Sequence, residues 1–139
     1  MKNIFLLLLL GLSLSASADW VKVKGATDAS SEHFTEGDTI RQTGPMNTMR
    51  RVWQLTHLAK GGSNQFFSIK QYMEYDCRTR RVRVLEESQF SEYWAQGTSL
   101  VVMGPDMQPG QWSDIGKSGL GESIFKRVCP HDDSDASKD

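Results

Sequence analysis

The stretch FSIKQYMEYDCRTRRVRVLEESQF (residues 67–90) decides the fold of this chain. In its first half, apolar side chains recur with a period of two, so that Ile69, Met73 and Tyr75 share one face of an extended chain. This period is typical of a half-buried antiparallel strand. A second extended run follows at once. The stretch therefore predicts two long strands joined by a tight reversal at residues 78–81.

Shorter strand patterns precede this hairpin: WVKVK (20–24), HFT (33–35), DTIRQTG (38–44) and MRRVWQLTHL (49–58). In the last of them, Trp53 and Leu55 lie on one face, and Val52 and Gln54 lie on the other. This pattern predicts further strands of the same antiparallel sheet.

The C-terminal part of the domain changes to a helical period. In SGLGESIFKRVCP (118–130), Leu120, Ile124 and Val128 form one apolar stripe. The segment before it, GPDMQPGQW (104–112), is rich in glycine and proline and is expected to be a loop, with its tryptophan as an anchor. We therefore expect an α+β fold, an antiparallel sheet of about six strands with a C-terminal helix packed on one face.

The first 18 residues have the features of a secretory signal peptide: one lysine, a short apolar run and a small-residue end. A buried N-terminal helix is the alternative interpretation. We expect cleavage between Ala18 and Asp19, and no cysteine is present there to carry a lipid anchor. The expectation is an exported protein, periplasmic or secreted and not lipid-anchored, with one domain (19–130) and a disordered acidic tail (131–139).

The charge of the expected domain argues against a dedicated nucleic-acid binder. Leaving out Lys2 and Lys138 reduces the 16 basic residues to 14, and leaving out the four aspartates of the tail reduces the 17 acidic residues to 13. The domain is thus close to neutral, whereas nucleic-acid binders are usually strongly basic. No stretch after the signal peptide is apolar enough to span a membrane.

The chain has two cysteines, Cys77 and Cys129. In the oxidising compartment of an exported protein, cysteines usually pair, and two cysteines allow one intramolecular disulfide. A free or intermolecular thiol is an alternative. A metal ligand or a catalytic thiol, with His33, His57 or His131 as its base, is a weaker one.

Four arginines lie at the reversal: Arg78, Arg80, Arg81 and Arg83. They form either a solvated hairpin tip neutralised by nearby acids, with Asp76 opposite Arg83, or a patch for an anionic ligand. Such a patch would be extended by Arg50, Arg51 and Lys70. Nucleic-acid binding is the third alternative.

The sequence resembles the surface-adhesin protein E family of small exported domains in Gram-negative bacteria. The similarity covers residues 20–130, and its most specific parts are Tyr75 to Arg78, Trp53, and Trp112 before the helix that ends at Cys129. The resemblance implies a six-stranded antiparallel sheet with a C-terminal helix and the pairing of the two cysteines. It also implies binding of host matrix or serum glycoproteins. The family's basic binding stretch is not matched residue for residue, so no binding site is carried over.

We therefore expect an exported, non-enzymatic binding domain whose partner is a host matrix or serum glycoprotein, or a sulfated glycan. No hydrolase, zinc-protease or phosphate-loop motif is present. The alternative function is an envelope assembly protein that acts through sheet-edge pairing, which includes formation of a homodimer. We expect no cofactor. A haem-type ligand held by His33 or His57 is a weaker idea.

Overall fold

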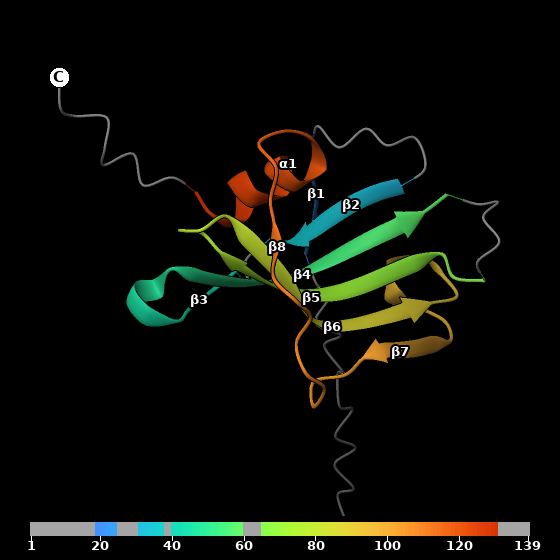
Figure 1. Ribbon diagram of the computed structural model, residues 1–139. Helices are drawn as coiled ribbons and strands as arrows, with labels where there is room; N and C mark the ends of the chain where they lie inside the picture. Colours follow the sequence, from blue (N-terminus) through green and yellow to red (C-terminus); the bar gives the residue numbers. More distant parts are fainter. Residues whose placement is uncertain (1–18, 25–30, 38–39, 60–64, 131–139) are drawn as a thin grey trace, which may run out of the picture.

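Figure 1 shows the computed structural model of the chain, which describes residues 19–24, 31–37, 40–59 and 65–130. The expected signal peptide and the expected acidic tail lie outside these residues, and with them the cleavage site after Ala18. Those three features remain predictions. Among the helices that the structure describes, none is long and apolar enough to cross a membrane.

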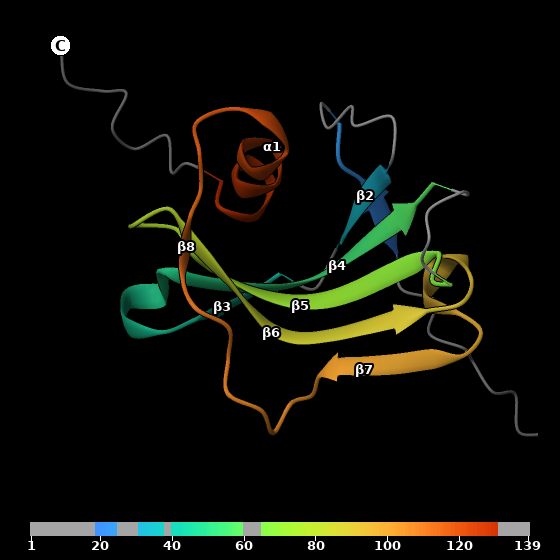
Figure 2. The ribbon, with the colours of Figure 1, turned by 45° about the vertical axis from the view of Figure 1, so that its right-hand side comes forward.

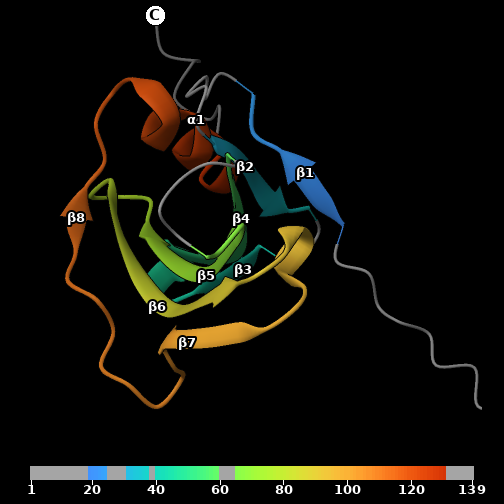
Figure 3. The same ribbon diagram turned by 90° about the vertical axis from the view of Figure 1, so that its right-hand side faces the viewer.

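The fold is built on one antiparallel sheet with the strand order β1-β2-β4-β5-β6-β7. Two short strands complete it, β3 beside β4 and β8 beside β6. The strands are β1 (Trp20–Lys22), β2 (Ser31–Glu36), β3 (Arg41–Thr43), β4 (Met49–Leu58), β5 (Ser68–Asp76), β6 (Arg81–Phe90), β7 (Ser99–Met103) and β8 (Ser113–Asp114). Figure 3 shows β1 and β7 at opposite ends of the curved sheet. The expected fold class is confirmed.

Strands β2 and β3 lie end to end along the same edge of β4. Strand β2 pairs with β4 residues 54–58, and β3 pairs with residues 49–51. The two short strands expected around residues 36–38 are therefore present, but they pair with β4 and not with each other. A short 3-10 helix, η1 (Pro45–Asn47), connects β3 to β4.

Helix α1 (Gly119–Val128) packs on one face of the sheet, as Figures 1 and 2 show. The core between them contains Met73, Tyr75, Ile124 and Val128, which the two periodicities placed inside, together with Val52 and Phe125. Full burial of each such side chain contributes about 1.5–3 kcal/mol. Ser118 precedes the helix without a side-chain capping hydrogen bond, so packing and not capping accounts for its position.

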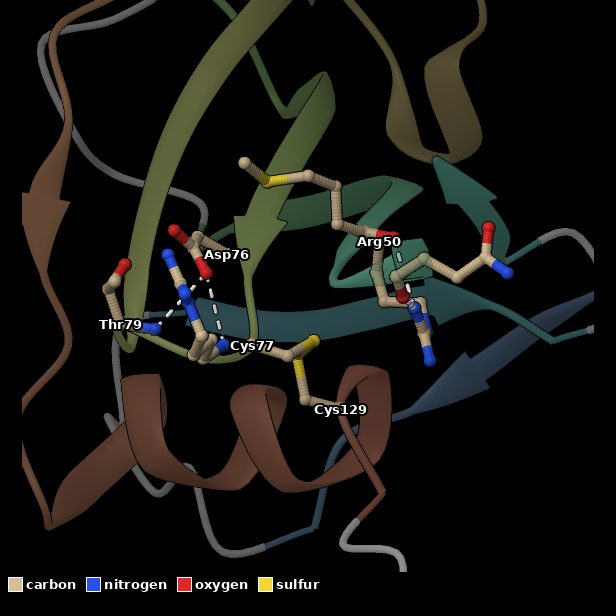
Figure 4. Close-up of a disulfide and its surroundings, with 8 residues drawn as sticks. Arg50, Asp76, Cys77, Thr79 and Cys129 are labelled. Carbon is tan, nitrogen blue, oxygen red and sulfur yellow. Dashed lines mark hydrogen bonds between the residues drawn. A yellow bond between two sulfur atoms is a disulfide. The ribbon is translucent and has the colours of Figure 1, made fainter. Parts of the chain in front are cut away.

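A disulfide joins the helix to the sheet. Cys77, directly after β5, is bonded to Cys129, directly after α1, with 5.6 Å between their Cα atoms (Figure 4). The two residues are 52 positions apart, and closing a loop of that length stabilises a fold by about 4 kcal/mol on the chain-entropy estimate. In the core, Gln54 donates a hydrogen bond to the Tyr75 hydroxyl, and burial raises the pKa of Tyr75 to about 12.

The face of the sheet opposite α1, called here the helix-free face, is covered only in part. At one end the 3-10 helix η2 (Tyr93–Ala95) lies against Leu58, Ser68 and His57. At the other end, the segment 104–116 returns from β7 along the outer edge of β6 to β8. Its middle is anchored where the Gly110 N–H donates to the Val84 carbonyl at 2.8 Å.

Candidate binding surfaces

The turn at the hairpin tip is held by Asp76. The Asp76 carboxylate accepts hydrogen bonds from the backbone N–H groups of Arg78, at 3.0 Å, and Thr79, at 3.1 Å (Figure 4). Burial opposes ionisation of this carboxyl, but the hydrogen bonds from Thr79 and Arg78 outweigh it, and the pKa of Asp76 lies below its ordinary value. The tight reversal expected between the two long strands is confirmed as the turn Cys77–Arg80.

The arginines at this tip do not point in one direction. Arg80 turns toward the helix, where it forms an ion pair with Glu122 and lies 4.3 Å above the Phe125 ring. Arg81 and Arg83 lie on the helix-free face, and Arg78 is exposed at the turn itself. The structure therefore divides the predicted patch between two sides of the hairpin.

The register of the hairpin corrects one expectation. Asp76 pairs with Arg81, and Arg83 pairs with Glu74, so Arg83 is not opposite Asp76. The reason is the length of the turn. Residues 77–80 form it, so the last pair of the β5–β6 ladder is Asp76 with Arg81.

Glu74 is the centre of the helix-free face at this end. Arg51 from β4 donates to Glu74 Oε2 at 2.7 Å, and Arg83 from β6 donates to Oε1 at 2.6 and 2.9 Å. The Glu74 side chain is only 4% exposed. Burial alone would raise the pKa of Glu74, but the two guanidinium groups outweigh it and the pKa is lowered. Two cations thus share one buried carboxylate.

Trp112 lies beside this cluster and confirms its expected role as an anchor of the loop. The guanidinium of Arg83 lies 4.5 Å from the centre of the Trp112 ring, and that of Arg81 lies 5.7 Å away. Cation–π contacts of this kind contribute about 0.5–2 kcal/mol each. They hold the segment 104–116 to the hairpin and fix the positions of both guanidinium groups.

The predicted extension of the arginine patch is only partly on this face. Lys70 lies 4.5 Å above the Trp53 ring, which stacks on Tyr72. Arg50 is placed elsewhere, because it pairs in register with Tyr75 and donates to the carbonyls of Asn47 and Met49.

The hairpin end of the sheet carries an excess of positive charge among the described residues. Seven arginines lie on the hairpin and on the adjacent parts of β3 and β4: Arg41, Arg50, Arg51, Arg78, Arg80, Arg81 and Arg83. Four carboxylates lie among or against them: Glu74, Asp76, Asp114 and Glu122. The excess of three positive charges is local, because the domain as a whole is near neutral.

The two described histidines are both engaged with protein groups. His57 is buried, and its Nε2 accepts a hydrogen bond from the Trp94 N–H at 3.2 Å. Burial lowers the pKa of His57, although the negative charge of Glu32 acts to raise it. His33 lies 2.9 Å from the Ser31 hydroxyl and 3.1 Å from the Thr56 hydroxyl.

The other ring nitrogen of His57, Nδ1, lies 3.9 Å from a carboxylate oxygen of Glu32. Both described histidines thus have partners within the protein, and the haem-type ligand stays a prediction. His131 lies outside the described residues. Within the part of the chain that the structure describes, no three histidine, cysteine or acidic side chains gather as a metal site would need.

A second surface is apolar and lies at the edge strand β7. Leu100 is 52% exposed, Val101 61% and Val102 45%, and Met107 in the following turn is 55% exposed. Sequence reasoning did not single out this segment, although SLVVM is an uncharged run of strand-forming residues that a scan for exposed edges would find.

Comparison with known proteins identifies the chain's relatives. A sequence profile of the family described as surface-adhesin protein E matches residues 20–130. Two solved structures of Haemophilus influenzae protein E are similar in fold. The selenomethionine form has a TM-score of 0.61 at 11% identity over 79% of this chain and 84% of that one. A second structure has a TM-score of 0.59 at 11% identity over 79% and 83%. No curated protein sequence matches the chain.

Proposed function

The chain belongs to the surface-adhesin protein E family, and on that premise we propose that it is an exported, non-enzymatic binding module whose hairpin end recognises an anionic macromolecule. Membership of a surface-adhesin family implies an exported, adhesin-like protein. The proposed ligand is an acidic host matrix or serum glycoprotein, or a sulfated glycan, and no cofactor takes part. The proposed location is the periplasm or the exterior.

One observation carries this proposal: Arg51 and Arg83 share the single carboxylate of Glu74. The two guanidinium groups and the one carboxylate together carry a net charge of +1. Both guanidinium groups are held in fixed orientations. A planar guanidinium fork suits sulfate and carboxylate groups, and a fixed one loses little conformational entropy on binding. Two further arginines extend the same surface. Arg41 on β3 pairs in register with Arg51 on β4, and Arg81 on β6 pairs with Asp76 on β5.

The test is binding of the purified, oxidised protein to immobilised heparin and to polyglutamate at 50 and 300 mM salt. The decisive variant is Arg41→Gln, Arg78→Gln and Arg81→Gln together, since none of these arginines belongs to the buried Glu74 bridge. The matched control is Lys22→Gln, Lys24→Gln and Lys117→Gln, which removes the same charge from exposed lysines outside the cluster of seven arginines.

We expect the parent protein and the control to bind one or both anionic supports at low salt, and to bind more weakly at high salt. The arginine variant should bind at least tenfold more weakly than the control. Equal losses in the two variants would mean that only net charge matters. Equal binding at both salt concentrations would contradict recognition of an anion.

A second candidate function, an envelope assembly protein that acts through sheet-edge pairing, is favoured by the exposed apolar edge at β7.

A further inference from the structure

The middle of the helix-free face carries two stacked aromatic side chains. Trp53 on β4 pairs in register with Tyr72 on β5, and their rings stack with 4.7 Å between centres and 26° between planes. Both side chains are half-buried. Along the sheet they lie between the end covered by η2 and the cluster around Glu74. Binding of an anion by arginines alone leaves this pair without a role.

Charged side chains surround the stack. The Lys70 ammonium lies 4.5 Å from the centre of the Trp53 ring. Arg51 is two residues before Trp53 on the same face of β4, so their Cα atoms are about 7 Å apart. Glu86 on β6 pairs in register with Tyr72 and therefore lies on the same face. The aromatic pair thus has cations on both sides along the sheet and a carboxylate beside it.

This combination of groups suits an acidic sugar. A pyranose ring presents C–H groups on one face, and these pack on the electron-rich face of an aromatic ring. The carboxylate of a uronic acid accepts hydrogen bonds from lysine and arginine, and sugar hydroxyl groups can donate to Glu86. An acidic polypeptide has neither the saturated ring nor this density of hydroxyl groups, and Glu86 repels its carboxylates.

We propose that the Trp53–Tyr72 stack binds a sugar ring of a linear polysaccharide that contains uronic acids. Lys70 holds an anionic group on one side of that ring, and Arg51 and Arg83 hold one on the other. The side chains of these two arginines remain 39% and 27% exposed, although both are bonded to Glu74. The inference rests on the function proposed above and narrows its ligand to an acidic glycan.

The spacing of the cations predicts that chain length matters. Lys70 and Glu74 are four positions apart on β5, so the lysine and the arginine pair are about 14 Å apart along the strand. One sugar contacts only one of these two places, whereas a chain of several sugars contacts both. Binding at the second place is then intramolecular and gains from effective concentration. Affinity should therefore rise from a disaccharide to an octasaccharide.

The experiment compares hyaluronan with polyglutamate, because carboxylates are the only charged groups of both polymers and only hyaluronan has sugar rings. Calorimetric titration of the oxidised protein at 50 mM salt measures both affinities, with hyaluronan fragments of two, four and eight sugars beside the polymer. The variants are Tyr72→Leu, which removes the ring, and Tyr72→Phe, which keeps it. Neither variant changes the charge of the protein, and melting temperatures verify that each one is folded.

The parent and Tyr72→Phe should bind hyaluronan at least tenfold more tightly than polyglutamate of the same charge. Tyr72→Leu should lose at least fivefold in affinity for hyaluronan and less than twofold for polyglutamate. As a second readout, the indole N–H signal of Trp53, assigned with Trp53→Phe, should shift more strongly in NMR spectra when hyaluronan is added than when polyglutamate is added.

Three results would overturn the proposal and leave anion binding by the arginines intact. These are a parent that binds hyaluronan no better than polyglutamate, a Tyr72→Leu variant that binds hyaluronan like the parent, and a Tyr72→Leu variant that loses both ligands equally. In the last case the stack would only support the arginines. A protein that binds neither polymer would instead contradict the function proposed above, and this inference with it.

Discussion

Arg83 gives two hydrogen bonds to a single oxygen of Glu74, from Nε at 2.9 Å and from Nη2 at 2.6 Å. The other oxygen of the same carboxylate accepts from Arg51. Strand β5 is thus joined to both of its neighbours by one buried side chain on the helix-free face. Its stabilising effect depends on Glu74 being ionised, which ties the stability of the sheet to pH.

Replacing Glu74 by glutamine should lower the free energy of unfolding by about 2 kcal/mol at pH 7, because charge-assisted hydrogen bonds are lost. The pKa of Glu74 is lowered from 4.5 in the folded protein. Its contribution is therefore fully present above pH 4.5 and is lost as the pH falls through the lowered value. Urea unfolding from pH 7 to pH 3 should show the parent and the variant converging. The control is Glu86→Gln on β6, and a constant gap between Glu74→Gln and the parent would contradict this account.

Removing the disulfide, by Cys77→Ala with Cys129→Ala, should lower the free energy of unfolding by about 4 kcal/mol. The helix is then held to the sheet by packing, by the Arg80–Glu122 pair and by the hydrogen bond that Arg127 donates to the Thr35 hydroxyl. Urea unfolding followed by circular dichroism measures the change, and the oxidised parent treated with a reductant should approach the same midpoint. An unchanged midpoint would show that packing alone holds the helix in place.

His57 should make the end of the sheet under η2 sensitive to mild acid. Burial lowers the pKa of His57 from 6.5, so the folded state favours the neutral ring that accepts from Trp94. The contribution of His57 to the free energy of unfolding is fully present above pH 6.5 and is lost as the pH falls through the lowered pKa. The backbone amide signal of Trp94, followed by NMR from pH 8 to pH 4, should move with a midpoint below 6.5. His57→Gln should abolish that transition, and a midpoint above 6.5 would rule out the assignment.

Arg80 should tolerate glycine better than alanine. Its φ of 55° lies in the left-handed region, where a residue with a Cβ is strained by about 1 kcal/mol or more. Both variants lose the contacts with Glu122 and Phe125, so their difference isolates the backbone term. Arg80→Gly should therefore be more stable than Arg80→Ala by about 1 kcal/mol in urea unfolding. Equal stability would mean that the turn relaxes when the side chain is removed.

Periodicity predicted the core well, because one face of the sheet and one stripe of the helix are covered by each other. Met73 and Tyr75 from the strand and Ile124 and Val128 from the helix are buried together as expected. The disulfide followed from the expected compartment and from there being two cysteines. These features depend on local apolar patterns and on residue chemistry, and both can be read directly from the sequence.

The second face could not be predicted in the same way. Glu74 occupies a polar position of the alternating pattern, which indicates solvent, yet it is buried. Its burial depends on Arg51 and Arg83 from the two neighbouring strands, and therefore on the registers of β5 with β4 and with β6. The position of Trp94 could not be predicted either, because its left-handed backbone in η2 and its contact with His57 leave no pattern in the sequence.

The long strand β6 is covered along its outer edge by three consecutive pieces of one segment. Strand β7 pairs with its last residues, Gly110 bonds to Val84 in the middle, and β8 pairs with Arg81 and Val82. A bare ten-residue edge would offer a long template for aggregation. The segment after β7 shortens that exposed edge to the five residues of β7, which are few for a growing fibril. Loss of this pairing would therefore be expected to favour aggregation through the outer edge of β6.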